Sequence, residues 1–135
     1  MKGSTPPAHQ GHSRRLRILV VDDNEVLLAA VRGLLRLMGH SADVARNGRE
    51  ALEAAARNRY DVVLLDIQMP EMGGFEAART LRRDAPSGTP PRIIGLSGEP
   101  ADRESYEAAG MDDFLVKPVS PRDLARVLVP AHESV

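Results

Sequence analysis

Short apolar runs alternate along the chain with segments of helical periodicity. The apolar runs are Ile18–Val21, Ala42–Ala45 (the weakest), Val62–Leu65, Ile93–Leu96 and Phe114–Val116. The helical segments are Glu25–Met38, Arg49–Arg57, Phe75–Arg83, Ala101–Ala109 and Arg122–Val129. Strands that are apolar on both faces and alternate with helices are typical of a parallel sheet with helices on both sides.

The helix boundaries carry typical stop and start residues. Gly39 and Gly110 follow helical segments, and glycine commonly ends a helix. Ser120 precedes Pro121, which is an N-cap residue followed by proline at the first helical position. Right-handed crossovers leave few topologies for five parallel strands. We therefore predict one α/β domain with the flavodoxin-like strand order 2-1-3-4-5.

The composition fits a single globular domain. The chain has 135 residues, 42% of them apolar and 27% charged, and its longest apolar run is far below the roughly 18 residues of a membrane span. The formal net charge of −1 gives no electrostatic basis for nucleic-acid binding by the domain itself. The absence of cysteine excludes disulfides and thiolate chemistry.

The two ends of the chain differ from its middle. Residues 1–15 combine Gly, Pro, Ser and His without periodicity, so we expect a disordered leader. They contain no apolar segment of the secretory-signal type. We predict that the domain spans residues 16–129 and that residues 130–135 form a short tail. A cytoplasmic location without membrane insertion is expected.

Polar side chains follow the apolar runs at the points where the predicted strands end. Asp22 and Asp23 follow the first run, Asp66 the third, Ser97 the fourth and Lys117 the fifth. The carboxyl ends of parallel strands meet at one edge of a sheet, and ligands bind there at the switch point between strands 1 and 3. We therefore expect three carboxylates, one hydroxyl and one ammonium in a single cleft.

Each of these residues also has a purely structural interpretation. Asp22, Asp23 and Asn24 could cap the following helix, Asp66 could belong to a turn, Ser97 could cap the next helix and Lys117 could be a solvated cation. Three adjacent carboxylates, however, repel one another. A hard divalent cation relieves that repulsion, which favours Mg²⁺, with Mn²⁺ as an alternative ion.

The distribution of cations singles out one lysine. Lys2 and Lys117 are the only lysines among the 18 Lys and Arg residues. A compact ammonium in so arginine-rich a chain indicates a site for which a planar guanidinium is unsuited. Lys117 beside the carboxylates would suit an incoming phosphoryl group.

Four segments together resemble a known family. The stretches "ILVVDDNE", "VVLLDIQMPEMGGFE", "IIGLSG" and "FLVKP" resemble the response-regulator receiver domains of two-component and phosphorelay signalling, across roughly residues 16–129. The acidic pair, the single aspartate, the serine and the Lys-Pro pair occur at strand ends in the order of the family. The resemblance implies a signalling domain that catalyses only its own phosphorylation and dephosphorylation, not a separate enzyme.

The resemblance also implies roles for the acidic residues. Asp66 matches the aspartate that accepts a phosphoryl group from a partner's phosphohistidine. Asp23, Asp66 and the backbone carbonyl of Gln68 match the Mg²⁺ ligands, and Asp22 matches the residue that orients a metal-bound water.

Further positions match the conformational response of the family. Lys117 matches the lysine that pairs with the acceptor and then with phosphoryl oxygen, Ser97 the switch hydroxyl and Phe114 the aromatic switch position. The bond from Lys117 to Pro118 resembles the cis peptide of the family.

Two positions depart from the family's pattern. Gly73 occupies a place where Asp or Asn is usual, so we expect an altered turn and helix start without loss of chemistry. Phe114 lacks the hydroxyl of the Tyr found in some members, so its switching would be a packing event.

Two other functions compete with a phospho-accepting receiver. A phosphatase of the haloacid-dehalogenase type needs a second acid two residues after the nucleophile, where this chain has Gln68. A degenerate receiver that acts only as a binding module would lack one of the site residues, and none is missing. The sequence leaves open whether the chain is a stand-alone regulator or a receiver from a hybrid histidine kinase.

The first helical segment predicts a partner surface. Its apolar and small residues span an arc of about 220°, wider than the ~100° that covers a core. The residues expected to face the core are Leu27, Leu28, Val31, Leu35 and Met38. A flanking stripe consists of Val26, Ala30, Gly33 and Leu37. This stripe belongs to a broadly buried helix, or it consists of stray exposed apolar residues that need no explanation. Alternatively, it docks a sensor histidine kinase or histidine phosphotransfer domain, as in receivers that it resembles.

Overall fold

The protein is described by a computed structural model, which defines residues 15–69, 73–85, 90–99 and 103–128. Strands and helices alternate within these residues. They are β1 Arg17–Val21, α1 Glu25–Leu37, β2 Ser41–Ala45, α2 Gly48–Arg57, β3 Val62–Asp66, α3 Gly74–Arg83, β4 Arg92–Ser97, α4 Arg103–Ala108, β5 Asp113–Val116 and α5 Pro121–Leu128. All neighbouring strands are parallel, in the order β2-β1-β3-β4-β5. The predicted α/β fold and strand order are confirmed.

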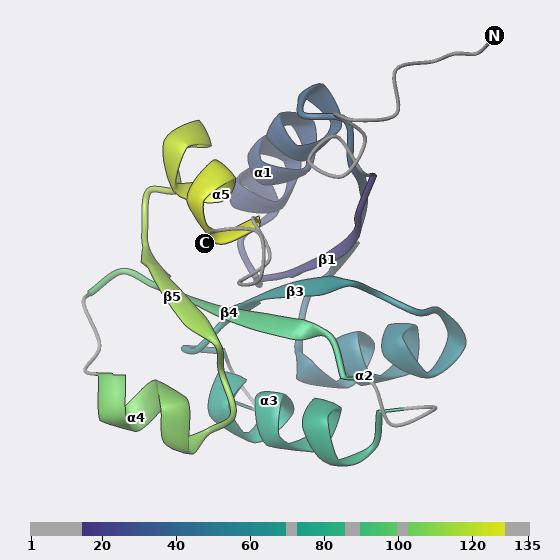
Figure 1. Cartoon of the computed structure of the whole chain (residues 1–135), viewed down its shortest axis with the longest axis vertical. Helices are drawn as coiled ribbons and strands as arrows, with labels where there is room; N and C mark the ends of the chain where they lie inside the picture. The colour runs from purple at the N-terminus through teal and green to yellow at the C-terminus, as the bar shows by residue number, and fades with distance from the viewer. Residues whose placement is uncertain (1–14, 70–72, 86–89, 100–102, 129–135) are drawn as a thin grey trace, which may run out of the picture.

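The sheet separates two layers of helices. Helices α1 and α5 cover one face, and α2, α3 and α4 lie on the other (Figure 1). The side chains of β3 alternate between the two cores: Val62 and Leu64 pack with α1 and α5, whereas Val63 and Leu65 pack with α2 and α3. Because β3 is buried on both faces, its polar residue, Asp66, lies at the carboxyl end of the strand.

The observed boundaries refine the predicted ones at the functional edge. Strand β3 includes Asp66 and β4 includes Ser97, so both polar residues end buried strands. Helix α1 ends at Leu37, with Met38 as its C-cap. Residues 101, 102 and 129, placed in helices by the sequence pattern, lie outside the described residues, as do the expected tail and the leader up to residue 14.

The predicted helix boundaries have the expected local geometry. Gly39 and Gly110 have φ values of 93° and 87°, which L side chains rarely adopt. Before α5, the Ser120 hydroxyl accepts a hydrogen bond from the Asp123 N–H at 3.1 Å, and Asp123 Oδ2 accepts one from the Ser120 N–H at 3.3 Å. This reciprocal pair fixes the start of α5 directly after Lys117 and Pro118. None of the helices described is long and apolar enough to span a membrane.

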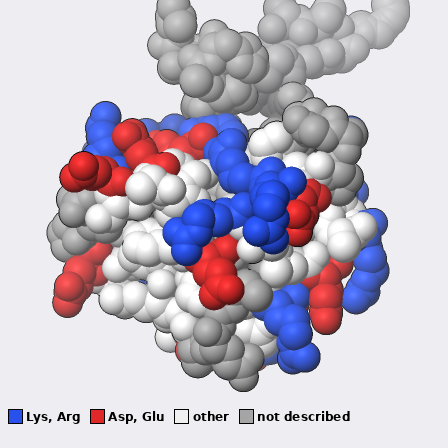
Figure 2. All heavy atoms as spheres, turned by 90° about the horizontal axis from the view of Figure 1, so that it is seen from below, with Lys and Arg blue, Asp and Glu red and all other residues white. Residues whose placement is uncertain are grey.

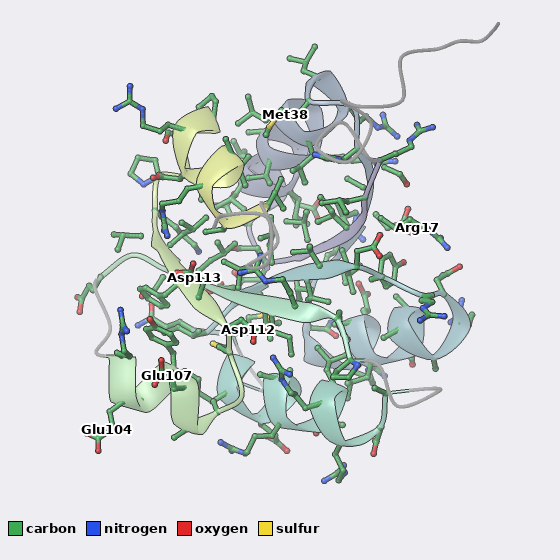
Figure 3. The ribbon with its side chains drawn as sticks, viewed as in Figure 1. Arg17, Met38, Glu104, Glu107, Asp112 and Asp113 are labelled. Atoms are coloured by element: carbon green, nitrogen blue, oxygen red, sulfur yellow. The ribbon has the colours of Figure 1, made fainter. Side chains whose placement is uncertain are left out.

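An ion pair joins α3 to the segment that leads into β5. Arg82 of α3 pairs with Asp112, and its Nε donates to the Gly110 carbonyl at 2.7 Å. Asp112 also accepts a hydrogen bond from the Ile93 N–H at 2.8 Å, and it lies beside Asp113 at the start of β5 (Figure 3). Basic and acidic side chains lie next to each other on the face that contains α3 and α4 (Figure 2). These contacts fix the start of β5, the strand that carries Phe114 and ends before Lys117.

Candidate functional site

Three carboxylates meet at the carboxyl edge of the sheet. Asp22, Asp23 and Asp66 each offer an oxygen, and these oxygens lie within 4.8 Å of one another. Asp22 and Asp66 are buried, whereas Asp23 is exposed. The clustering follows from the topology, because β1 and β3 are neighbours whose ends coincide at the switch point. The predicted acidic cleft is therefore present.

The ammonium group of Lys117 enters the same cleft. Its Nζ lies 2.7 Å from Asp22 Oδ2 and 3.5 Å from Asp66 Oδ2. The backbone N–H of Lys117 donates to the Ser97 carbonyl at 2.7 Å, which ties the end of β5 to the end of β4. The peptide bond from Lys117 to Pro118 is cis, as expected. Lys117 thus lies close enough to Asp66 to contact an anionic group added to that carboxylate.

Helix capping does not account for the acidic pair. Asn24 is the N-cap of α1, and its Oδ1 accepts hydrogen bonds from the Val26 and Leu27 N–H groups at 2.9 and 3.1 Å. Asp22 Oδ1 accepts one from the Asn24 N–H at 2.9 Å. Asp22 Oδ2 is buried and, apart from the ion pair with Lys117, accepts no hydrogen bond of good geometry. The partner of this oxygen is the Lys117 ammonium and not the first turn of α1, so capping does not explain the position of Asp22.

The environment of Asp66 raises its pKa above the usual value for an aspartate. Burial is the largest cause, and the charge of Asp22 adds to it. The Gln68 N–H, which donates to Asp66 Oδ1 at 2.9 Å, and the Lys117 ammonium act in the opposite direction. Partial burial lowers the pKa of Lys117, but the carboxylates of Asp22 and Asp66 outweigh it and raise that pKa. The cleft therefore holds more negative charge than one ammonium balances.

Ser97 lies at the same edge, and its side chain takes part in a local turn. Its side chain is buried, and its Oγ accepts a hydrogen bond from the Glu99 N–H at 3.1 Å. Helix α4 is described only from Arg103, which is well beyond this turn. The hydroxyl is thus held by a local turn at the carboxyl end of β4.

Phe114 packs in an aromatic pair that sequence reasoning missed. Its ring stacks on Tyr106 of α4, with centroids 5.7 Å apart and an interplanar angle of 12°. Gly95 of β4 leaves room beneath the ring, because a Cβ there would lie 3.1 Å from Phe114 Cδ1 and 2.8 Å from the Met111 sulfur. The chain has only two Tyr and two Phe residues. The sequence signal that could have indicated this pair is the position of Tyr106 in the predicted helix that directly precedes the strand of Phe114.

Two glycines, Gly73 and Gly74, lie at the start of α3, and sequence reasoning missed the role of the second. Gly73 is the N-cap of α3 and makes no side-chain capping bond, which agrees with the expected altered helix start. A Cβ at Gly74 would lie 2.3 Å from the backbone oxygen of Asp66 and 2.4 Å from the Ile67 Cα. Gly74 therefore lets α3 approach the backbone that positions Asp66.

The stripe on α1 is exposed, which fits both a docking surface and stray exposed apolar residues. The exposed fractions of Val26 and Leu37 are 79% and 86%, and Ala30 and Gly33 are also exposed. Of the residues expected to face the core, three are buried and two pack partly against it: Leu28, Val31, Leu35, Leu27 and Met38. The interpretation as a broadly buried helix is wrong.

The family of the chain is decided by a match over most of its length. The family model described as the response regulator receiver domain matches residues 18–129. The chain belongs to this family. Receiver domains bind Mg²⁺ at an acidic site, and this chain has a cluster of three carboxylates, Asp22, Asp23 and Asp66, that could hold a metal ion. The fold and the acidic cleft thus belong to a receiver domain of two-component signalling.

The chain is also similar in sequence to a sensor protein. The chain is 41% identical over 106 residues to the aerobic respiration control sensor protein ArcB of Escherichia coli (strain K12). The aligned region covers 78% of this chain and 14% of ArcB. The receiver therefore spans a small part of that relative.

Solved receiver structures superpose on the described fold. The chemotaxis response regulator CheY4 of Vibrio cholerae is 32% identical with a TM-score of 0.77, covering 84% of this chain and 96% of that one. The receiver domain of the sensor histidine kinase PA1611 from Pseudomonas aeruginosa PAO1 is 34% identical with a TM-score of 0.74, covering 84% of this chain and 94% of its own. The PA1611 structure has a magnesium ion coordinated in the active site cleft.

Proposed function

We propose that Asp66 of this receiver accepts a phosphoryl group from a phosphohistidine. The observation that carries the proposal is the position of Asp66, a buried carboxylate at the end of β3 that lies close to both the acidic pair and Lys117. An Asp66 carboxylate oxygen attacks phosphorus, the phosphorus–nitrogen bond breaks, and the imidazole leaves and takes up a proton. The product is an aspartyl phosphate, a covalent intermediate of a recognised type.

The donor set fits a magnesium ion. Asp23, Asp66 and the backbone carbonyl of Gln68 would hold it, and Asp22 would orient a metal-bound water. All of these donors are oxygens, as Mg²⁺ requires, and oxygens of the three carboxylates lie within 4.8 Å of one another. When bound, the ion supplies positive charge that offsets the repulsion between the carboxylates and the incoming phosphoryl group.

The remaining site residues respond to the added charge. The Lys117 ammonium, 3.5 Å from Asp66 Oδ2, stabilises a phosphoryl oxygen. The Ser97 hydroxyl gives up its bond with the Glu99 N–H and donates to the phosphoryl group. Phe114 then repacks against Tyr106 and Gly95, and the surface formed by α4 and β5 changes.

The partner of this reaction is a sensor histidine kinase or a histidine phosphotransfer domain, and the receiver acts in the cytoplasm. The docking stripe, Val26, Ala30, Gly33 and Leu37, is exposed on α1. Helix α1 begins directly after the acidic pair, so a helix docked on the stripe would lie beside the cleft. Small side chains at Ala30 and Gly33 would allow close approach of helices. The alternative function is a binding module that is never phosphorylated.

A small-molecule donor separates the two functions without a partner. The full chain is incubated with acetyl phosphate and either Mg²⁺ or EDTA, and the intact mass is measured. We expect one added phosphoryl group in wild type with Mg²⁺, none with EDTA and none in Asp66→Asn. Absence of the added mass in wild type, with both acetyl phosphate and a set of phosphohistidine donors, would favour the binding module instead.

A further inference from the structure

A polar cavity of about 410 Å³ lies at the opposite edge of the sheet from Asp66. It occupies the end of α1 that Met38 marks in Figure 3, near the amino ends of β1 and β2. The side chains that define its chemistry are Arg15, Arg32, Arg36, His40, Ser41 and Asp43. These residues have no part in the phosphoryl chemistry proposed above.

The positive charge of this cavity is not balanced within the described structure. Arg15, Arg32 and Arg36 form no ion pair with any residue in the parts of the chain that the structure describes. Asp43 is the acid in the lining, and its Oδ2 accepts a hydrogen bond from the Tyr60 hydroxyl at 2.7 Å. Residues 1–14 contain no Asp or Glu.

The guanidinium of Arg32 has an unsatisfied donor. Its Nε is buried and has no hydrogen-bond partner among the described residues. A buried N–H of a charged group without a partner is unfavourable and rare in folded proteins. A cation in the last turn, such as Arg36, is favoured by the helix dipole. The helix dipole does not explain the buried Nε of Arg32. Arg32 and Arg36 also repel each other, because they are like charges four residues apart in a helix.

His40 adds a further donor. Its Nδ1 accepts a hydrogen bond from the Leu16 N–H at 3.1 Å, so the neutral ring carries its hydrogen on Nε2. Burial and the charge of Arg15 lower the pKa of His40, which keeps the ring neutral at physiological pH. Together with the Ser41 hydroxyl, the cavity presents guanidinium, imidazole and hydroxyl donors.

We propose that this cavity binds the phosphate groups of a small, multiply charged ligand. Arginine forks match the oxygens of phosphate in bidentate geometry, and three of them with one acid suit a ligand with more than one negative charge. The cavity volume lies within the range of small-molecule sites. Negative charge bound beside Arg32 and Arg36 would offset the repulsion between their guanidinium groups.

The test uses inorganic pyrophosphate as the probe and the full chain without Mg²⁺. Amide and arginine Nε resonances are followed by NMR during the titration. We expect saturable shifts at Arg32, Gly39, His40 and Ser41, and at least tenfold weaker binding in Arg32→Gln and in Arg36→Gln. The matched control, Arg49→Gln on the exposed surface of α2, should bind as wild type does.

Parallel titrations separate phosphate recognition from general anion attraction. Citrate, a polycarboxylate, should bind at least tenfold more weakly than pyrophosphate. Equal binding of citrate, shifts that never saturate, shifts centred on Asp66, or wild-type affinity in Arg36→Gln would each overturn the proposal. Arg36 is exposed, so its replacement keeps the test valid even if Arg32→Gln does not fold. The outcome is independent of phosphorylation at Asp66.

Discussion

Lys117 and Asp22 form the shorter of the two ion pairs in the acidic cleft, with 2.7 Å between Nζ and Oδ2. The distance from the same ammonium to Asp66 Oδ2 is 3.5 Å. In the unphosphorylated chain, the Lys117 ammonium therefore lies closer to Asp22 than to Asp66. A phosphoryl group on Asp66 would offer Lys117 a more highly charged partner. We infer that Lys117 moves from Asp22 toward that group.

The first prediction follows from this change of partner. A guanidinium at position 117 is larger and planar, and it fits poorly between one carboxylate and one phosphoryl oxygen. Lys117→Arg should fold and take up phosphate from acetyl phosphate more slowly, and it should lose the conformational response. The measurement is the set of amide shifts at Ser97 and Phe114 before and after phosphorylation. Wild-type shifts in phosphorylated Lys117→Arg would refute the role of the ammonium.

The second prediction concerns the docking stripe on α1. Ala30→Arg places a long cation in the exposed stripe, where a partner helix would approach closely. Initial rates of transfer from a phosphohistidine donor should fall at least tenfold, which corresponds to roughly 1.4 kcal/mol. The rate of labelling by acetyl phosphate, which needs no docking, should stay within about twofold of the wild-type rate. This corresponds to about 0.4 kcal/mol.

The control for this variant is an exposed alanine on another helix. Ala56→Arg on α2 adds the same charge away from the stripe. Its transfer rate should equal that of wild type. An equal fall in Ala56→Arg, or a fall with both donors in Ala30→Arg, would mean that the stripe is not the docking surface.

The third prediction compares two adjacent glycines. Gly74→Ala would place a Cβ 2.3 Å from the Asp66 backbone oxygen, so the turn between β3 and α3 must shift. Urea unfolding should show a loss of roughly 1–3 kcal/mol. In Gly73→Ala the added Cβ has no atom of the described residues within 4 Å and φ is −68°, so the loss should stay below about 1 kcal/mol, the preference for Gly over Ala at an N-cap. Equal stability of the two variants would contradict the close approach.

The pattern of the sequence predicts the cleft well because the backbone determines it. Each polar residue follows a strand that is apolar on both faces, and a parallel sheet brings the ends of those strands to one edge. Asp22, Asp66, Ser97 and Lys117 therefore reach the predicted edge whatever their rotamers. The exposed stripe on α1 is predicted for a similar reason, since the period of the helix determines which residues face the core.

The features that sequence reasoning missed depend on contacts between distant side chains. The shorter distance from Lys117 to Asp22 than to Asp66 is set by rotamers, which periodicity does not report. The stacking of Tyr106 on Phe114 and the space at Gly95 depend on how α4 lies against β5. The need for glycine at position 74 becomes visible only when α3 is placed against the end of β3.

The fourth prediction concerns alkaline stability. Burial, followed by the hydrogen bond to Asp43, raises the pKa of Tyr60 from 10.0 to about 12. Above pH 10 the unfolded state loses this proton while the folded state keeps it, so the free energy of unfolding falls as the pH rises. The contribution of Tyr60 is complete below about pH 10 and is lost by about pH 12, a decline of roughly 2 kcal/mol.

Two tyrosine variants check this assignment by urea unfolding across the alkaline range. Tyr60→Phe should be less stable by roughly 1 kcal/mol near neutral pH, because the bond to Asp43 is lost. It should also show a smaller alkaline decline than wild type. Tyr106→Phe, which leaves Tyr60 in place, should keep the full decline. An unchanged decline in Tyr60→Phe would show that Tyr60 does not titrate as described.

The position of the phosphoryl group is tested most directly by locating it in the chain. The full chain is phosphorylated by a phosphohistidine donor with Mg²⁺ and treated with borohydride, which reduces an aspartyl phosphate to homoserine. Peptide mass spectrometry then identifies the modified residue. We predict homoserine at position 66 in wild type and none in Asp66→Asn. Homoserine at position 22 or 23, or undiminished modification of Asp66→Asn, would contradict Asp66 as the phosphoryl acceptor.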